Sequence, residues 1–170
     1  MKKLLTIFFL FSFLFINHCS KNEKIEIVEI EEDQIEGQMI KAYKEGMVAF
    51  ENQLYLEAAK KFNEAEILFP QSEWAPRSAL MTAYAYFYDD YNNRAISELI
   101  NFFKKYPNDP NLPYAHYLLA MSYYNLIVDE KKDLEPLKNS KKQFEYIVEN
   151  YPNTEFSLDS KFKLDLINEM

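Results

Sequence analysis

Three stretches of the chain repeat the same order of small, large apolar and proline positions. They read AAKKFNEAEILFP, AISELINFFKKYP and SKKQFEYIVENYP, and they end at Pro70, Pro107 and Pro152. In each stretch a large apolar residue follows a small one by four positions, and the proline comes eight positions later. Apolar residues three and four positions apart form one face of a helix, and proline ends helices. The pattern therefore predicts three amphipathic helices that recur at intervals of 37 and 45 residues.

A second apolar helix is predicted before each of these three. The stretches are MIKAYKEGMVAF (39–50), PRSALMTAYAYFY (76–88) and PYAHYLLAMSYYNL (113–126). Each has one small residue, Gly46, Ala83 or Ala120, where we expect its partner helix to approach closely. Residues 154–170 predict one more helix of this kind. Residues 38–170 are therefore expected to be all-α, a helix-turn-helix solenoid of three repeats plus one extra helix.

The first helix of each pair carries many aromatic and methionine residues on the face opposite its partner. The chain has 13 Tyr and 14 Phe, and tyrosine combines a broad apolar surface with a hydroxyl group for hydrogen bonding. We predict that these faces line a groove for an extended, partly apolar peptide. An aromatic stripe at helical spacing is also typical of a core, and both interpretations stay open for each residue. The groove candidates are Tyr43, Met47, Phe50, Leu80, Tyr84, Phe87, Tyr88, Tyr117, Met121 and Tyr124.

The N-terminal residues form a different kind of segment. Two lysines precede an apolar run from 4 to 16, which has the length of a signal-peptide core rather than of a membrane span. The only cysteine, Cys19, follows this run and has no second thiol to pair with. Residues 1–18 are therefore predicted to be a signal peptide, and the glutamate-rich residues 19–37 a flexible tether. A free thiol in a poorly cleaved signal and a retained N-terminal membrane helix remain as alternatives.

Charge and composition exclude several classes of function. Without residues 1–18 the chain has two lysines fewer, so its formal net charge falls from −8 to −10. Such a chain does not suit the phosphates of a nucleic acid. With only two glycines it has no glycine-rich phosphate loop. His116 is the only histidine after residue 18, and no nucleophile or metal-binding motif accompanies it. We expect neither an enzyme nor a metal or other cofactor, apart from a covalent lipid.

The repeats resemble the tetratricopeptide repeat, which the first one matches at Gly46, Ala58, Phe62, Ala65 and Pro70. The consensus tryptophan of that repeat is absent. The lipoprotein-like cysteine, the acidic tether and the Phe-Pro and Tyr-Pro helix ends together resemble the BamD family, lipoproteins of the outer-membrane β-barrel assembly machinery. The stretches that carry this resemblance are FPQSEWAPRSALMTAYAYF, FFKKYPNDPNLPYAHYLLAMSYY and FEYIVENYPNTEFSLDSKFKL.

Two features depart from these families. Asn17 and His18 stand where lipoproteins prefer small residues before the cysteine. Members of the BamD family are also longer, so this chain is expected to be a truncated form that stops within the fourth repeat.

The resemblance implies a non-enzymatic adaptor on the periplasmic face of the outer membrane, anchored by a lipid on Cys19. The implied partners are the barrel-inserting subunit BamA, other lipoproteins of the machinery and unfolded outer-membrane proteins, whose C-terminal strand ends in aromatic residues. Nucleic acid is not among them. The expected truncation implies that the chain keeps the substrate groove and loses much of the docking surface for BamA.

A second resemblance is to the periplasmic coordinator of the Tol–Pal envelope system. The repeats of that protein also favour Phe-Pro ends and alanine-rich helices. It is secreted as a soluble chain with an N-terminal coiled coil, whereas residues 20–37 are short and carry no heptad pattern. Cys19 and the tether therefore favour the BamD resemblance.

Overall fold

The structure is a computed structural model that describes residues 32–128 and 133–169. Seven helices make up this part of the chain, which contains no strand, so the all-α prediction is confirmed. The helices are α2 (Glu32–Glu51), α3 (Tyr55–Leu68), α4 (Trp74–Tyr88), α5 (Asn92–Lys105), α6 (Leu112–Asn125), α7 (Glu135–Asn150) and α8 (Glu155–Glu169). The predicted signal peptide, Cys19 and residues 20–31 of the predicted tether lie outside the described residues.

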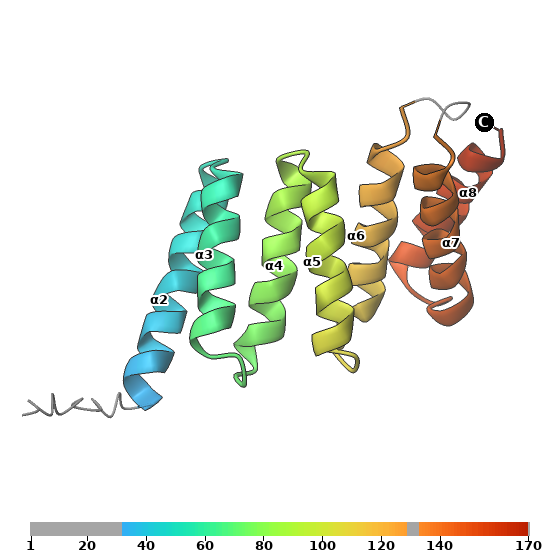
Figure 1. The fold of residues 1–170 in the computed structure, drawn as a ribbon. Helices are drawn as coiled ribbons and strands as arrows, with labels where there is room; N and C mark the ends of the chain where they lie inside the picture. The colour runs from blue at the N-terminus through green and yellow to red at the C-terminus, as the bar shows by residue number, and fades with distance from the viewer. Residues whose placement is uncertain (1–31, 129–132, 170) are drawn as a thin grey trace, which may run out of the picture. The chain divides into compact units, whose positions relative to one another are not determined.

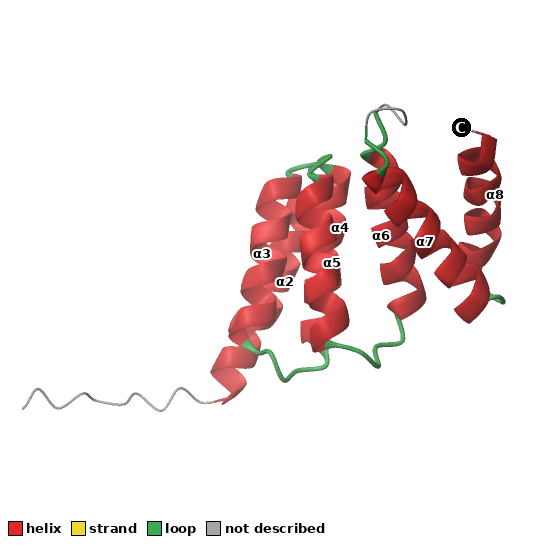
Figure 2. Cartoon of the chain, turned by 45° about the vertical axis from the view of Figure 1, so that its right-hand side comes forward, coloured by secondary structure: helices red, strands yellow, loops and turns green. Residues whose placement is uncertain are grey.

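The helices pack in the order in which they follow one another along the chain (Figure 1). Each contacts the next from α2 to α8, and α6 also contacts α4 and α8. In both views α2 and α3 lie at one end of the helical array and α8 at the other (Figure 2). The helices thus form three consecutive pairs, α2 with α3, α4 with α5 and α6 with α7, and α8 follows as one more first helix.

The predicted helices match these elements, with one difference at the start. The stretches that run from a small residue to a proline form the second helix of each pair, α3, α5 and α7. α2 begins at Glu32, so residues 32–37, predicted as tether, are helical. Ile35 is partly buried, and no proline interrupts this segment. These contributions outweigh the cost of Gly37 inside the helix, which is about 1 kcal/mol.

The turn inside each of the first two pairs has the same conformation. Gln53 and Asp90, which are 37 residues apart, have positive φ angles of 61° and 58°. The N–H group that follows each of them donates to the carbonyl five residues earlier, at 2.9 and 3.0 Å. A left-handed residue with such a bond is a common helix C-terminus. The third pair has a longer connection instead, from 126 to 134.

Small residues let the two helices of a pair approach closely, as predicted. A Cβ atom on Gly46 would lie 2.7 Å from Cδ1 of Phe62, a fully buried ring in α3. Ala83 and Ala120 are fully buried, and the Ser140 hydroxyl of α7 donates to the carbonyl of Ala120 at 3.1 Å. Each pair, together with the first helix that follows it, encloses its own cluster of buried apolar residues.

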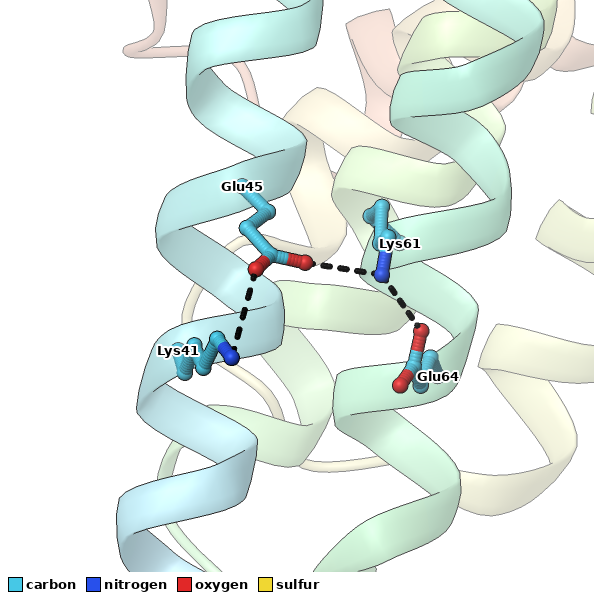
Figure 3. Close-up of polar contacts among 4 residues, drawn as sticks. All are labelled: Lys41, Glu45, Lys61 and Glu64. Atoms are coloured by element: carbon cyan, nitrogen blue, oxygen red, sulfur yellow. Dashed lines mark hydrogen bonds and ion pairs between the residues drawn. The ribbon is translucent and has the colours of Figure 1, made fainter.

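The outer face of the first pair is charged (Figure 3). Nζ of Lys61 lies 2.7 Å from Glu45 and 3.2 Å from Glu64, and Nζ of Lys41 lies 3.9 Å from Glu45. Thirty-seven residues later, the position of Glu45 is held in α4 by Thr82, which is buried where α4 packs on α3. The α2 end of the array therefore carries charges at positions that are buried inside the array, and repeat arrays need such polar ends for solubility.

Candidate peptide-binding face

Aromatic rings connect the first helix of every pair to the next first helix. Phe50 of α2 stacks on Tyr84 of α4, with ring centroids 5.2 Å apart and planes inclined by 16°. Tyr84 contacts Tyr114 of α6 at 6.1 Å, and Tyr114 contacts Phe156 of α8 at 5.5 Å. Ring pairs of this kind contribute about 0.5–1.5 kcal/mol each beyond the area they bury. The row therefore ties α2, α4, α6 and α8 together along one side of the array.

Three further rings flank this row. Tyr88 is 47% exposed and lies edge-on to Phe50 at 5.4 Å. Tyr55 of α3 contacts Phe50 at 5.1 Å, and Tyr117 contacts Phe156 at 5.4 Å. We refer to the whole set as the aromatic ladder, which consists of Phe50, Tyr55, Tyr84, Tyr88, Tyr114, Tyr117 and Phe156.

Three hydroxyl groups of the ladder, those of Tyr84, Tyr114 and Tyr117, keep their protons at neutral pH. Tyr84 donates to the hydroxyl of Tyr88 at 3.0 Å, and burial, assisted by this bond, raises the pKa of Tyr84 to about 12. Burial also raises the pKa values of Tyr114 and Tyr117, and Tyr117 donates to Asp159 at 2.6 Å. The face thus offers uncharged hydroxyls beside apolar rings. This combination suits the backbone groups and aromatic side chains of an extended peptide.

The ten predicted groove residues divide into three groups. Tyr43 and Leu80 are buried in the core, with exposed fractions of 9% and 7%, so their side chains do not reach the face. Four belong to the aromatic ladder, namely Phe50, Tyr84, Tyr88 and Tyr117. The other four are partly buried and pack against the three apolar clusters, namely Met47, Phe87, Met121 and Tyr124. Peptide binding by any of these residues stays a prediction.

Three ladder residues were missed by sequence reasoning. Tyr114 lies three residues before Tyr117 on α6, so helical spacing could have found it. Phe156 follows Pro152 at the start of α8, a helix for which no groove position was counted. Tyr55 belongs to α3, a second helix, and no pattern in the sequence brings it to a face built from first helices.

His116 packs among aromatic side chains between α5 and α7. Its ring stacks on Phe103 at 4.2 Å and 18°, and its Nδ1 lies 3.0 Å from Oε1 of Gln143. Burial lowers the pKa of His116, and the Gln143 contact opposes this effect only in part. A neutral imidazole results at pH 7. In residues 32–128 and 133–169 no group of three or more His, Cys, Asp or Glu side chains could hold a metal.

None of the helices in the described part of the chain combines the length and the hydropathy needed to cross a membrane.

Comparison with known proteins matches residues 35–170 to the YfiO family, described as "Outer membrane lipoprotein". The outer membrane protein assembly factor BamD of Caulobacter vibrioides is 37% identical over 113 residues, which cover 66% of this chain and 37% of the relative. BamD of Rickettsia prowazekii is 35% identical over 127 residues, which cover 75% and 51%. The chain thus spans about half the length of these relatives, or less.

Solved structures confirm the helix-pair fold. The tetratricopeptide domain of Arabidopsis OM64 matches with a TM-score of 0.60 at 12% identity, over 77% of this chain and 97% of that domain. The first tetratricopeptide domain of Spaghetti (RPAP3), bound to an HSP90 peptide, also matches with a TM-score of 0.60, at 18% identity over 79% and 93%. At these identities the likeness establishes the tetratricopeptide-like fold alone.

Proposed function

The chain belongs to the YfiO family of outer membrane lipoproteins, and on that premise we propose that it is a non-enzymatic adaptor of the outer-membrane β-barrel assembly machinery. Its task is to help receive and insert unfolded outer-membrane proteins. The matched relatives are named assembly factors for such proteins, which supports the proposal. The absence of a catalytic motif in the sequence agrees with a binding role.

The proposed location is the periplasmic face of the outer membrane, with a lipid on Cys19 as the anchor. The signal-like run before Cys19 and the membership in a lipoprotein family support this location. Two or more acyl chains hold a protein firmly, since each buried methylene adds about 0.8 kcal/mol. We expect labelled palmitate to enter the wild-type protein and not Cys19→Ala, and the variant to leave the membrane fraction. Membrane-bound, unlabelled wild type would contradict the lipid anchor.

The aromatic ladder is the observation that carries the proposed substrate role. It combines rings from four first helices with neutral hydroxyls, and Tyr88 at its edge is 47% exposed. An unfolded barrel strand offers alternating aromatic side chains and free backbone groups, which such a face can bind. The proposed docking partners are BamA and other lipoproteins of the machinery. No cofactor besides the lipid is proposed.

Binding of a barrel-strand peptide tests this role. The probe is a fluorescent peptide that copies the last strand of an outer-membrane barrel and ends in phenylalanine, and its binding is followed by anisotropy. We expect Tyr84→Ala to weaken binding about tenfold, because one aromatic contact contributes about 1 kcal/mol or more. The matched control is Tyr91→Ala, an exposed tyrosine outside the ladder, which should leave binding unchanged.

Two results would contradict the role. Either equal weakening by the two substitutions or equal binding of a peptide that ends in alanine would show that the ladder does not recognise aromatic strand ends. Co-purification from membranes distinguishes the two proposed assemblies. Recovery with BamA supports barrel assembly, whereas recovery with Pal alone would favour the Tol–Pal alternative. That alternative rests on the repeat pattern only.

A further inference from the structure

Arg77 places a cation on the same side of α4 as the aromatic ladder. It lies in the first turn of α4 and is exposed. Its guanidinium carbon lies 5.8 Å from the ring centroid of Tyr43 and 5.5 Å from that of Trp74. An aromatic ring attracts a cation placed over its face, so these two rings hold the guanidinium in place.

Two levels of contact join α2 and α4 on this side. Phe50 stacks on Tyr84 at one level, and the guanidinium of Arg77 lies over Tyr43 at the other. In both helices the two residues are seven positions apart, which is almost two full turns. Arg77 and Tyr84 are therefore about 10.5 Å apart along the axis of α4. The ladder thus continues into a cationic position toward the start of α4.

Arg77 also lines a cavity of about 590 Å³. The cavity lies between the start of α4 and residues 105–111, which connect α5 to α6. Binding sites for small ligands typically have volumes of about 300–1,000 Å³. The cation therefore stands beside a space large enough for the end of a peptide.

The charged residues that line this cavity differ in whether they already have a partner. Lys105 lies 2.8 Å from Glu66, and Asp109 accepts two hydrogen bonds from the asparagine two residues later. Arg77 and Glu73 form no ion pair and no side-chain hydrogen bond with any described residue. A guanidinium has five N–H donors, so those of Arg77 are free for an anionic ligand.

We propose that Arg77 binds the C-terminal carboxylate of the peptide that the ladder receives, an inference that rests on the proposed substrate role. The planar guanidinium fits a carboxylate through two parallel hydrogen bonds. An extended chain advances about 3.3 Å per residue, so about three residues span the distance from Arg77 to the level of Tyr84. The last three side chains of the peptide then lie along the ladder, and the peptide runs antiparallel to α4.

The test uses the full chain and two peptides that differ in one group. Both copy the last strand of an outer-membrane barrel, end in phenylalanine and carry a fluorophore at the N-terminus. One ends in a free carboxylate and the other in a carboxamide. We expect the free acid to bind about tenfold more tightly at low salt, because charge-assisted hydrogen bonds are stronger than neutral ones. The difference should shrink at high salt, since ions screen exposed charges.

Variants assign this preference to one side chain. Arg77→Gln should lower the affinity for the free acid to that for the carboxamide and leave the carboxamide unaffected. Arg77→Lys keeps the charge but not the planar fork, so it should retain part of the preference. Glu73→Gln removes the unpaired carboxylate beside Arg77 and should strengthen binding of the free acid alone. The matched control is Arg94→Gln, an exposed arginine of α5, which should leave the preference unchanged.

The outcomes separate this inference from the proposed substrate role. If the wild type bound both peptides equally while Tyr84→Ala weakened both, the ladder would keep its role and Arg77 would not be the carboxylate site. Equal weakening of both peptides by Arg77→Gln, or the same loss of preference with Arg94→Gln, would also overturn the inference. If neither peptide bound, the proposed substrate role would fail and this inference with it.

Discussion

At Gly46 the absence of a side chain sets the distance between α2 and α3. An added Cβ would lie 2.7 Å from Cδ1 and 2.8 Å from Cε1 of Phe62. The Phe62 ring is fully buried and also contacts Tyr43 at 5.3 Å. It has little room to move, since protein interiors are close-packed.

Gly46→Ala should therefore destabilise the protein. Overpacking a core costs about 1–3 kcal/mol, and the better helix propensity of alanine returns about 1 kcal/mol. We expect a net loss of about 1 kcal/mol in the free energy of unfolding, measured by urea denaturation. Gly37→Ala is the matched control, because nothing lies within 4 Å of a Cβ at that position. It should stabilise α2, and a Gly46→Ala protein that gained as much would contradict the close-approach argument.

Predictions for single residues succeeded where one close contact determines which residue type can stand at a position. The small residues Gly46, Ala83 and Ala120 were placed correctly because a helix pair tolerates nothing larger there. Tyr43 and Leu80 were assigned to the groove, although each lies three residues before a small residue. Residues three apart share a helix face, so both side chains lie on the side of Gly46 and Ala83, whereas Tyr117, at the same distance before Ala120, is only partly buried and donates to Asp159 of α8.

At the scale of elements, the sequence predicted every described helix but placed the first residue of each helix less precisely. The ends of the second helices were marked by Pro70, Pro107 and Pro152. Helix starts were marked less clearly, since none of α3 to α7 has a side-chain hydrogen bond at its N-cap, although Pro113 stands in the first turn of α6. α3 and α7 therefore begin several residues before the small residue that defined the pattern, at Tyr55 and Glu135.

The ladder was predicted only in part for a related reason. Its positions were counted from the small residue of each first helix, and α8 has Asp165 at that position, 45 residues after Ala120. Without this reference Phe156 was not counted. Tyr55 was missed because it belongs to a second helix, and groove positions were counted on first helices only. Contacts between helices of different repeats depend on how the helix pairs stack on one another. The periodicity of apolar residues within one helix does not contain this information.

At the scale of the whole array, the two ends differ. The α2 end carries the ion pairs of Lys61 with Glu45 and Glu64, whereas α8 exposes Leu158 and Phe162. A repeat array is stabilised mainly by contacts between neighbouring units. Its stability is therefore sensitive to the few side chains that link one pair to the next by polar contacts.

Glu66 provides such a link between the first and second pairs. It lies in α3 and is 5% exposed, and its Oε1 accepts hydrogen bonds from Lys105 at 2.8 Å and from the hydroxyl of Tyr106 at 2.9 Å. Both donors stand at the end of α5, about 40 residues along the chain. Burial, together with Glu66, raises the pKa of Tyr106, so its hydroxyl remains a donor at neutral pH.

Glu66→Ala should lower the free energy of unfolding by about 1–3 kcal/mol, because the partly buried Tyr106 hydroxyl loses its acceptor. The loss should also be local. Hydrogen exchange is expected to accelerate in α2 to α5 and to stay unchanged in α7 and α8, since each pair depends on its neighbours. Glu64→Ala removes an exposed partner of Lys61 on the same helix and should change neither readout. Uniform acceleration in all helices would show instead that the array unfolds as a single cooperative unit and that Glu66 links no particular pair.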